Sequence, residues 1–319
     1  MKMFDYPDMN LIPKMCIVNS RSECDTRVKF GPHIFNLPVM PANMECVINE
    51  ELAIKLAQNG FFYVMHRFNI DVVSFCKTMI NNQLFTSISL GVNADSYKDI
   101  DLLRHNNIIP DYITIDIAHG HSIKMKNIIQ YIKDNLPSSY IIAGNVSTVE
   151  GTIDLEYWGA NAIKVGIGPG SACTTFNMTG FGSRGAQASI VSQCADATQY
   201  PDTNIIADGG ISHHGDISKS LVLGAHMVMI GGLFSSLTDS PGAVVHMDGA
   251  LYKEFWGSAS SFQSNKKNRI EGTKKLLAMK PHGILDEMNN IKESLQSAIS
   301  YGGGNSLHCF NSVEYFLKN

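Results

Sequence analysis

Short runs of apolar and β-branched residues recur along the chain, and each run is continuous rather than alternating with polar residues. Continuous apolar strands are typical of parallel sheets, because helices cover the sheet and leave no solvated face. Eight such runs begin at Leu37, Phe61, Phe85, Tyr112, Tyr140, Ala162, Asn204 and Met227. Most of these starts lie about 25 residues apart, the length of one strand, one helix and two short loops. The pattern therefore predicts eight successive β/α units.

Helix-like segments lie between and after these runs. The pattern predicts a helix over residues 50–59 that ends at Gly60, and another over Gly215–Leu223 that ends at Gly224. A last helix is expected near Ile284–Ile299, since apolar residues recur there with helical spacing. Its apolar face would carry Leu285, Met288, Ile291, Leu295 and Ile299.

Eight β/α units predict an α/β fold, a closed (β/α)8 TIM barrel of parallel strands over about residues 37–232. A doubly wound sheet is the competing arrangement, but it usually shows fewer repeats. No linker, low-complexity tract or long charge run divides the chain, so we expect a single domain over residues 1–319. Two segments depart from the rhythm and are predicted to be long active-site loops: residues 166–184 and 234–283.

The composition narrows the function classes. The 319-residue chain is 44% hydrophobic and 17% charged, which is typical of a globular protein with a sizeable core. Its net charge of −4 argues against a binder of nucleic acid or of an anionic membrane, because no basic excess offsets phosphates. We find no apolar core of a signal peptide and no apolar run long enough to span a bilayer. The seven cysteines are scattered without a CxxC motif, so a reduced, cytoplasmic location is expected.

One cysteine lies in a segment that favours chemistry. The loop after the sixth run contains Gly166, Gly168 and Gly170, which let the backbone approach an anion or coordinate a cation through carbonyl oxygens. Cys173 follows this turn and lies outside any apolar period. A lone cysteine is usually a small buried hydrophobe, but this position favours a nucleophilic thiolate. Its neighbours with hydroxyl groups are Ser171, Thr174 and Thr175.

Glycine pairs follow the seventh and eighth runs. Phosphate sites in barrels commonly use these two loops, where backbone N–H groups can face an anion. The glycines alone fit tight turns equally well. Asp208 would repel a phosphate, so it is expected to bind ribose hydroxyls instead. The glycines concerned are Gly209, Gly210, Gly231 and Gly232.

Two histidine pairs carry weaker signals. His119 and His121 could suggest a metal pair, but no third ligand or HExxH spacing supports it, so a hydrogen-bonding role is expected. His213 and His214 are interpreted as a solvated turn.

Taken together, the strings KVGIGPGSACTT, IAGNV, ADGG, MIGG and DIAHGHS resemble the inosine-monophosphate dehydrogenase and guanosine-monophosphate reductase superfamily. The resemblance covers almost the whole chain and keeps the order and spacing of these segments. The fold that it implies is a (β/α)8 barrel, in agreement with the eight runs.

Three features resemble the shorter bacterial branch of the reductases rather than the dehydrogenases. The runs from Phe61 and Phe85 follow each other at the normal interval, so the regulatory insert of the dehydrogenases is absent. The Arg-Tyr pair of their mobile flap is also missing, since Ile270 follows Arg269. The SRSE segment that begins at Ser20 is similar to that of the reductases, and DIAHGHS is similar to their bacterial branch.

The resemblance implies an NADPH-dependent reductive deamination of GMP to IMP with release of ammonia, a step of purine salvage. Cys173 would attack purine C2 and form a covalent thioimidate, which hydride from NADPH then reduces. Thr175 and Glu271 match the family's pair for proton transfer to the leaving ammonia. A homotetramer is also implied.

The resemblance further implies three sets of contacts. Phosphate and ribose would be bound by Ser171, Asp208, Gly209, Gly210, Gly231 and Gly232. The purine would be bound by Gly257, Ser258, Ala259, Glu271 and Gly272. The cofactor would be bound by Arg67, Asp116, Ile117 and Ala118, and by two segments that can come from a neighbouring subunit, Ser20 with Arg21 and Tyr301 with Gly302.

Some positions depart from the family pattern. Arg67 stands where the family's reductases have lysine, and Ser258 replaces a bulkier residue. A potassium ion is implied at the carbonyl oxygens of Gly168, Gly170 and Cys173. However, Phe176 stands where the family has a basic residue.

Two other functions remain as alternatives. A dehydrogenase that converts IMP to XMP with NAD⁺ would share the cysteine and the phosphate loops, but the missing Arg-Tyr pair argues against it. A catalytically silent nucleotide-binding regulator would be expected to lack Cys173, Thr175 or Glu271, and all three are present. We rank the reductase first, the dehydrogenase second and the regulator third.

Overall fold

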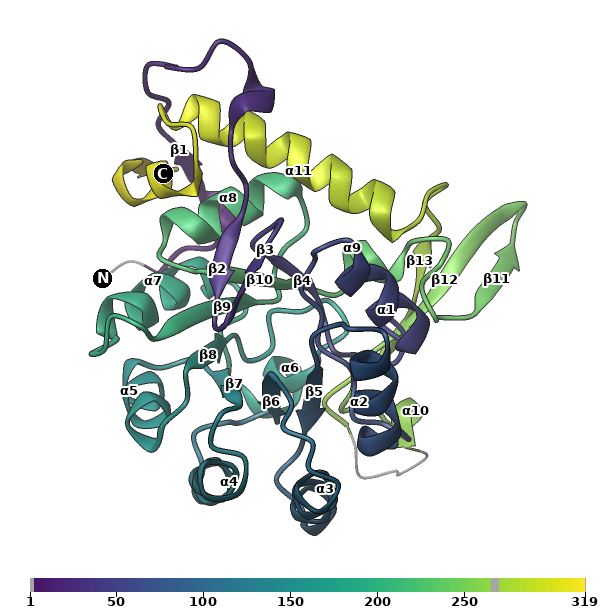
Figure 1. The fold of residues 1–319 in the computed structure, drawn as a ribbon. Coiled ribbons are helices and arrows are strands. Elements are labelled where there is room, and N and C mark those ends of the chain that lie inside the picture. Colours follow the sequence, from purple (N-terminus) through teal and green to yellow (C-terminus); the bar gives the residue numbers. More distant parts are fainter. Residues whose placement is uncertain (1–2, 265–269, 319) are drawn as a thin grey trace.

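The computed structural model describes residues 3–264 and 270–318. Within this part of the chain, seven strands form one curled sheet, and every neighbouring pair is parallel. The order is β4 (Val39–Pro41), β10 (Met227–Ile230), β9 (Asn204–Asp208), β8 (Ala162–Val165), β7 (Tyr140–Val146), β6 (Tyr112–Asp116) and β5 (Ser87–Leu90). Helices surround this sheet on its outer side (Figure 1). The arrangement is that of a (β/α)8 barrel, so the predicted fold class is confirmed.

The run from Phe61 is not a strand, and in that respect the prediction of eight strands is wrong. Residues 61–65 are buried and contact β5, but a single backbone–backbone hydrogen bond, from Met65 N to Ser87 O at 3.1 Å, does not make a ladder. Side chains add the other bonds: Ser89 Oγ donates to Met65 O, and Ser87 N donates to Tyr63 Oη. The side chains still alternate: Phe62 packs inside the barrel, whereas Tyr63 and Met65 pack in the outer core. An extended segment beside β5 thus stands where the second of the eight strands was expected.

The core has two layers, one inside the barrel and one between the sheet and the helices. A hairpin of β2 (Val28–Phe30) and β3 (His33–Phe35) contributes two phenylalanines to the inner layer. It lies against the amino ends of β6 and β7, where Tyr112 Oη donates to Phe30 O at 2.6 Å. The amino end of the barrel is therefore filled, which leaves the carboxyl end for a cavity.

The helices carry the outer layer. They are α1 (Glu50–Gln58), α2 (Val72–Asn81), α3 (Ala94–His105), α4 (Ile123–Asn135), α5 (Val149–Trp158), α7 (Gln187–Ala197), α8 (His214–Val222) and α11 (Ile284–Tyr301). The three helices predicted above are confirmed to within two residues at each end. Gly60 and Gly224, expected to end α1 and α8, have φ values of +71° and +91°, a conformation that favours glycine. No helix in residues 3–264 and 270–318 is both long and apolar enough to cross a membrane.

Both long segments contain secondary structure that the pattern did not predict. Residues 166–184 include α6 (Thr175–Thr179), and residues 234–283 begin within α9 (Gly232–Ser235) and include α10 (Ser261–Ser264). The second segment forms an antiparallel sheet of β11 (Val244–Met247), β12 (Ala250–Trp256) and β13 (Lys274–Ala278), which projects from the barrel in Figure 1. This sheet brings the residues just before β13 back to the barrel.

Short elements join the two ends of the chain. The N-terminal part holds η1 (Tyr6–Asp8), β1 (Met9–Leu11) and η2 (Arg21–Glu23), and the C-terminal part holds η3 (Leu307–Ser312) and β14 (Tyr315–Leu317). β1 pairs with β14 in an antiparallel ladder.

Candidate active site

A cavity of about 1030 Å³ lies at the carboxyl ends of the barrel strands. Its walls come from the loops that follow β4, β6, β8, β9 and β10, together with residues of the 234–283 segment. A cavity of this size can hold a nucleotide and part of a second ligand. The position matches the face where barrels of this kind build their active sites.

Three candidate catalytic residues contact one another at this cavity. Cys173 Sγ lies 3.2 Å from Thr175 Oγ1, and Thr175 Oγ1 donates to Glu271 Oε2 at 2.8 Å. Thr175 is buried, whereas Cys173 and Glu271 are partly exposed and line the cavity. A thiol, a hydroxyl and a carboxylate therefore form one continuous chain of polar contacts.

Backbone pairing explains how Glu271 reaches Cys173. Cys173 and Gly272 form an isolated antiparallel bridge, and Thr174 N donates to Glu271 O at 3.1 Å. At Gly272 an added Cβ would lie 2.8 Å from Ser260 N, which is too close for any side chain. The absence of a side chain at Gly272 thus permits its close approach to Ser260, while the bridge to Cys173 places Glu271 over the loop.

A buried lysine connects two carboxylates at the floor of the cavity. Lys164 on β8 is 1% exposed, and its Nζ lies 3.1 Å from both Asp116 Oδ1 and Asp208 Oδ2. Asn43 donates to Asp116 at 2.7 Å, and Asn145 donates to Asp208 at 2.7 Å. Each carboxylate therefore has one charged and one amide partner.

The charge state of this cluster follows from a balance of burial and attraction. Burial opposes the charge on Asp116, but the opposite charge of Lys164 and the hydrogen bond from Asn43 outweigh it, so the pKa of Asp116 lies below its usual value. Burial likewise opposes the charge on Lys164, yet Asp116 and Asp208 raise the pKa of its ammonium above the usual value. Lys164 and Asp116 thus form an ionised pair, with Asp208 as the second carboxylate beside the lysine, and our sequence reasoning missed this central lysine.

Both glycine pairs line the cavity, but they differ in their contacts. Gly209 and Gly210 have φ values of +84° and +80°, so the tight turn itself favours glycine. Gly209 N donates to Met229 O at 3.3 Å, which directs that amide toward β10. Gly231 and Gly232 stand at the start of α9. The turn interpretation therefore accounts for Gly209, whose amide is used by β10, and the phosphate interpretation stays a prediction for the other three glycines.

The other candidate residues fall into two groups. The cavity is lined by Arg67, Ile117, Ala118, Gly168, Gly170, Ser171, Gly257, Ser258 and Ala259. Ser20, Arg21, Tyr301 and Gly302 are not among its described lining residues. They gather instead where η2 meets the end of α11, and Arg21 Cζ lies 5.9 Å from the centre of the Tyr301 ring.

The candidate potassium ligands show a partial fit. The carbonyl oxygen of Gly170 already accepts the Cys173 N–H at 3.0 Å, and the exposed Phe176 brings an apolar ring to the loop. In residues 3–264 and 270–318, no group of three His, Cys, Asp or Glu side chains could hold a metal ion. Arg269, whose neighbour separates the reductases from the dehydrogenases, lies outside the described residues.

The histidine predictions have mixed outcomes. His121 Nε2 lies 2.8 Å from Asp154 Oδ2, in agreement with a hydrogen-bonding role. The interpretation of His214 as part of a solvated turn is wrong, because its ring lies 3.2 Å from the buried carboxylate of Glu287. That contact comes from α11, which lies far along the chain and could not be foreseen from the local sequence.

Comparison with known proteins agrees with this geometry. The family described as IMP dehydrogenase / GMP reductase domain matches residues 3–317. A GMP reductase of Mycoplasma mycoides is 51% identical over 99% of this chain and 98% of its own length. GMP reductases of Bacillus licheniformis and Staphylococcus aureus are 52% and 50% identical over 99% of this chain and 96% and 97% of their own lengths.

Proposed function

We propose, from the premise that the chain belongs to the IMP dehydrogenase / GMP reductase family, that it converts GMP to IMP and ammonia with NADPH as the reductant. Its relatives make it an oxidoreductase, and their name points to GMP as the substrate. The balanced reaction is GMP + NADPH + 2 H⁺ → IMP + NADP⁺ + NH₄⁺. A reaction of this kind returns guanine nucleotides to the purine pool, which is a salvage role.

The observation that carries this proposal is the contact chain from Cys173 through Thr175 to Glu271. Deamination at a purine carbon needs a nucleophile that adds to the carbon and an acid that protonates the leaving amine. The Cys173 thiol would be the nucleophile and the Glu271 carboxyl group the acid, and the Thr175 hydroxyl group contacts both. A binding protein would have no use for this arrangement.

Cys173 Sγ forms a bond to purine C2, and the bond from C2 to the exocyclic nitrogen then breaks. The Thr175–Glu271 pair passes a proton to that nitrogen, which would otherwise be a poor leaving group. The product of this half-reaction is a thioimidate on Cys173. NADPH, when bound, supplies a hydride to C2 as the carbon–sulfur bond breaks, and the thiolate of Cys173 is regenerated.

The remaining residues of the cavity would bind the ligands. Asp208 would accept hydrogen bonds from ribose hydroxyls, since Lys164 and Asn145 fix its carboxylate from behind. The glycine loops at 209–210 and 231–232 would bind the phosphate together with Ser171. Asp116 and Arg67 would face the cofactor. Potassium at the loop carbonyls is the least supported part, because Phe176 adds no ligand there.

The cluster of Ser20, Arg21 and Tyr301 fits a second role. It lies away from the cavity of its own chain, at the junction of η2 and α11. We therefore assign it to the cofactor site of a neighbouring subunit, within a homotetramer in the cytoplasm.

The decisive experiment measures GMP-dependent oxidation of NADPH by the wild type and two variants. Cys173→Ser should abolish turnover but retain GMP binding, because the covalent route is lost and the phosphate and ribose contacts remain. Glu271→Gln should lower kcat by about 10²–10⁴-fold, the usual effect of removing a positioned acid or base, with a much smaller change in KM.

Three outcomes would contradict the proposal. Turnover of Cys173→Ser within a few-fold of the wild type would exclude the thioimidate. A nearly silent Glu271→Gln variant would exclude the proton-transfer role. Conversion of IMP to XMP with NAD⁺, faster than oxidation of NADPH by GMP, would identify the chain as the dehydrogenase.

A further inference from the structure

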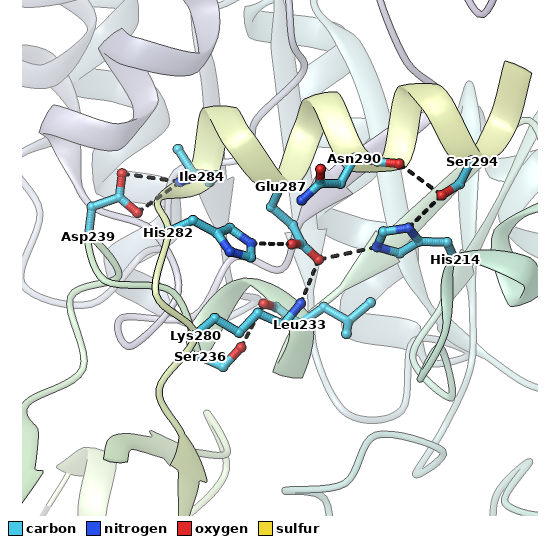
Figure 2. A network of polar contacts seen from close by, with 10 residues as sticks. All are labelled: His214, Leu233, Ser236, Asp239, Lys280, His282, Ile284, Glu287, Asn290 and Ser294. Carbon is cyan, nitrogen blue, oxygen red and sulfur yellow. Dashed lines mark hydrogen bonds and ion pairs between the residues drawn. The ribbon is translucent and has the colours of Figure 1, made fainter. Parts of the chain in front are cut away.

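A second buried charge lies outside the cavity, on α11. Glu287 is 1% exposed, and three side chains hold its carboxylate (Figure 2). Lys280 Nζ lies 2.7 Å from Oε1, His282 Nε2 lies 2.6 Å from Oε2, and His214 Nε2 lies 3.2 Å from Oε1. Burial opposes the charge on Glu287, but these three partners outweigh it and hold the pKa of the carboxyl far below its usual range.

The partners of Glu287 come from two segments that lead directly into the cavity. His214 is the first residue of α8, and the loop just before it, residues 208–212, lines the cavity. Lys280 and His282 follow β13, whose preceding residues carry Glu271 to Cys173. A single carboxylate thus connects the loop of the first glycine pair with the segment that carries the candidate acid.

Backbone hydrogen bonds also connect the loop of Gly231 and Gly232 with Lys280 and His282. Lys280 N donates to Ser236 O at 2.8 Å, and Thr238 N donates to His282 O at 3.1 Å. Ser236 ends α9, which begins beside Gly231 and Gly232, and it lines the cavity. The position of Lys280 and His282 therefore fixes α9 as well.

The carboxylate itself has a rigid support. Met288, Ile291 and Leu295 on α11 are buried in the outer core, and Asp239 accepts a hydrogen bond from Ile284 N at 3.0 Å at the start of the helix. Figure 2 shows Ser294 on one side of the His214 ring and Glu287 on the other. Ser294 Oγ lies 2.8 Å from His214 Nδ1. The ring of His214 is thus held at both nitrogens by α11.

We propose that Glu287 is a positioning residue that sets the spacing between the two glycine loops and thereby the affinity for the phosphate of a nucleoside monophosphate. The inference rests on the proposed function, because it takes these loops as the phosphate site. A carboxylate with partners from α8 and from the segment after β13 can hold both loops at one distance from α11. A neutral amide keeps the shape but loses the attraction to Lys280, so the loops would separate more easily.

The test compares Glu287→Gln with a matched control, Glu156→Gln. Glu156 is another buried carboxylate, but it lies on α5 and accepts hydrogen bonds from Gln199 N and Tyr200 N, away from the cavity. Calorimetry on the full chain would measure Kd for IMP and, by competition, for inosine. We expect Glu287→Gln to raise the Kd for IMP about tenfold or more and to change that for inosine less than twofold. The control should change neither.

Steady-state kinetics supply an independent readout. In Glu287→Gln the KM for GMP should rise. The kcat and the KM for NADPH should stay within about threefold, because the bridge from Cys173 to Gly272 and the bond from Thr174 N to Glu271 O hold Glu271 independently of Glu287. If this variant does not fold, Lys280→Met takes its place, since it leaves Glu287 with two partners.

The outcomes test the phosphate site and the positioning role of Glu287 separately. Equal affinity of the wild type for IMP and inosine would remove the phosphate site and with it the proposed role of the glycine loops. A wild type that prefers IMP, with a Glu287→Gln variant that keeps this preference within twofold, would overturn the positioning role alone. An equal loss of affinity for IMP and inosine in the variant would also overturn it, since that pattern indicates general loosening.

Discussion

The two buried charge clusters are opposites in composition. Inside the barrel, one cation, Lys164, serves two carboxylates, Asp116 and Asp208. Outside the barrel, one carboxylate, Glu287, is served by Lys280 and two histidines. Both obey the rule that a buried charge must be paired, but they differ in redundancy. The first cluster depends on a single group, whereas the second can lose one partner and keep two.

This difference matches the surroundings of the two clusters. The carboxylates beside Lys164 line the cavity. Asp116 uses both oxygen atoms within the protein, whereas Lys164 and Asn145 both contact Oδ2 of Asp208, so its Oδ1 is the oxygen that a ligand is expected to use. Such a site gains from a carboxylate that is held in place yet keeps one oxygen atom for a ligand. Glu287 is not among the described residues that line this cavity, so each additional partner adds stability without occupying a group that these ligands need.

The largest loss of stability and activity is expected when Lys164 is removed. Lys164→Met would leave two buried carboxylates without their shared cation, and we expect a loss of about 3–5 kcal/mol in the free energy of unfolding. Turnover should fall below detection, because Asp116 and Asp208 would repel each other and leave their positions. Urea denaturation and the NADPH assay would measure the two effects.

The matched control for this variant is Lys253→Met. Lys253 on β12 is also buried, but its ammonium donates to the carbonyl oxygen of Ser240 at 2.7 Å. Its loss should cost less than the loss of Lys164. Adding Asp208→Asn to Lys164→Met should recover part of the stability but not the activity. Equal stability losses in the two lysine variants would contradict the special role of Lys164.

The sequence contains a signal for the cluster around Lys164 but none for the cluster around Glu287. Lys164 interrupts a continuous apolar run, and a charge in the middle of a buried strand needs a partner, so the cluster around Lys164 could have been suspected. Glu287 occupies an ordinary position on an amphipathic helix. One of its partners, His214, is 73 residues away. No local pattern predicts a contact at that separation.

The same contrast separates the parts of the fold that were predicted from those that were not. The barrel strands and helices follow from local periodicity and from glycines such as Gly60. The sheet of β11–β13 was missed although it carries a recognisable signal: Asp248 and Gly249, both with positive φ, form the turn between β11 and β12. The contact of Glu271 with Thr175 depends on that sheet, and only the resemblance to a family pointed to it.

Lowering the pH tests the charge on Glu287, and the expected change in the free energy of unfolding is smaller than that for Lys164→Met. The pKa of Glu287 is lowered in the folded state, so its contribution is fully present above the unfolded value of about 4.3 and is lost as the pH falls below it. Glu287→Gln lacks this contribution. The free energy of unfolding of the wild type should therefore exceed that of the variant by about 2–3 kcal/mol near pH 7, and the gap should narrow progressively as the pH falls below about 4.3 toward the lowered pKa of the folded state. Urea denaturation across this range measures the gap, and a gap independent of pH would exclude a charged Glu287.

The smallest expected effect is the loss of one partner from the redundant cluster. His214→Leu removes the ring contacts to Glu287 and Ser294, but Lys280 and His282 remain at 2.7 and 2.6 Å from the carboxylate. Since the lost contact to Glu287 is the longest of the three, we expect a cost of only about 1 kcal/mol in the free energy of unfolding. Lys280→Met should cost more, because it removes a full charge at short distance. The double variant should cost more than the sum of the two, since Glu287 then retains a single partner. Strict additivity in urea denaturation would mean that the three partners act independently, and the redundancy that distinguishes this cluster from that of Lys164 would have no physical basis.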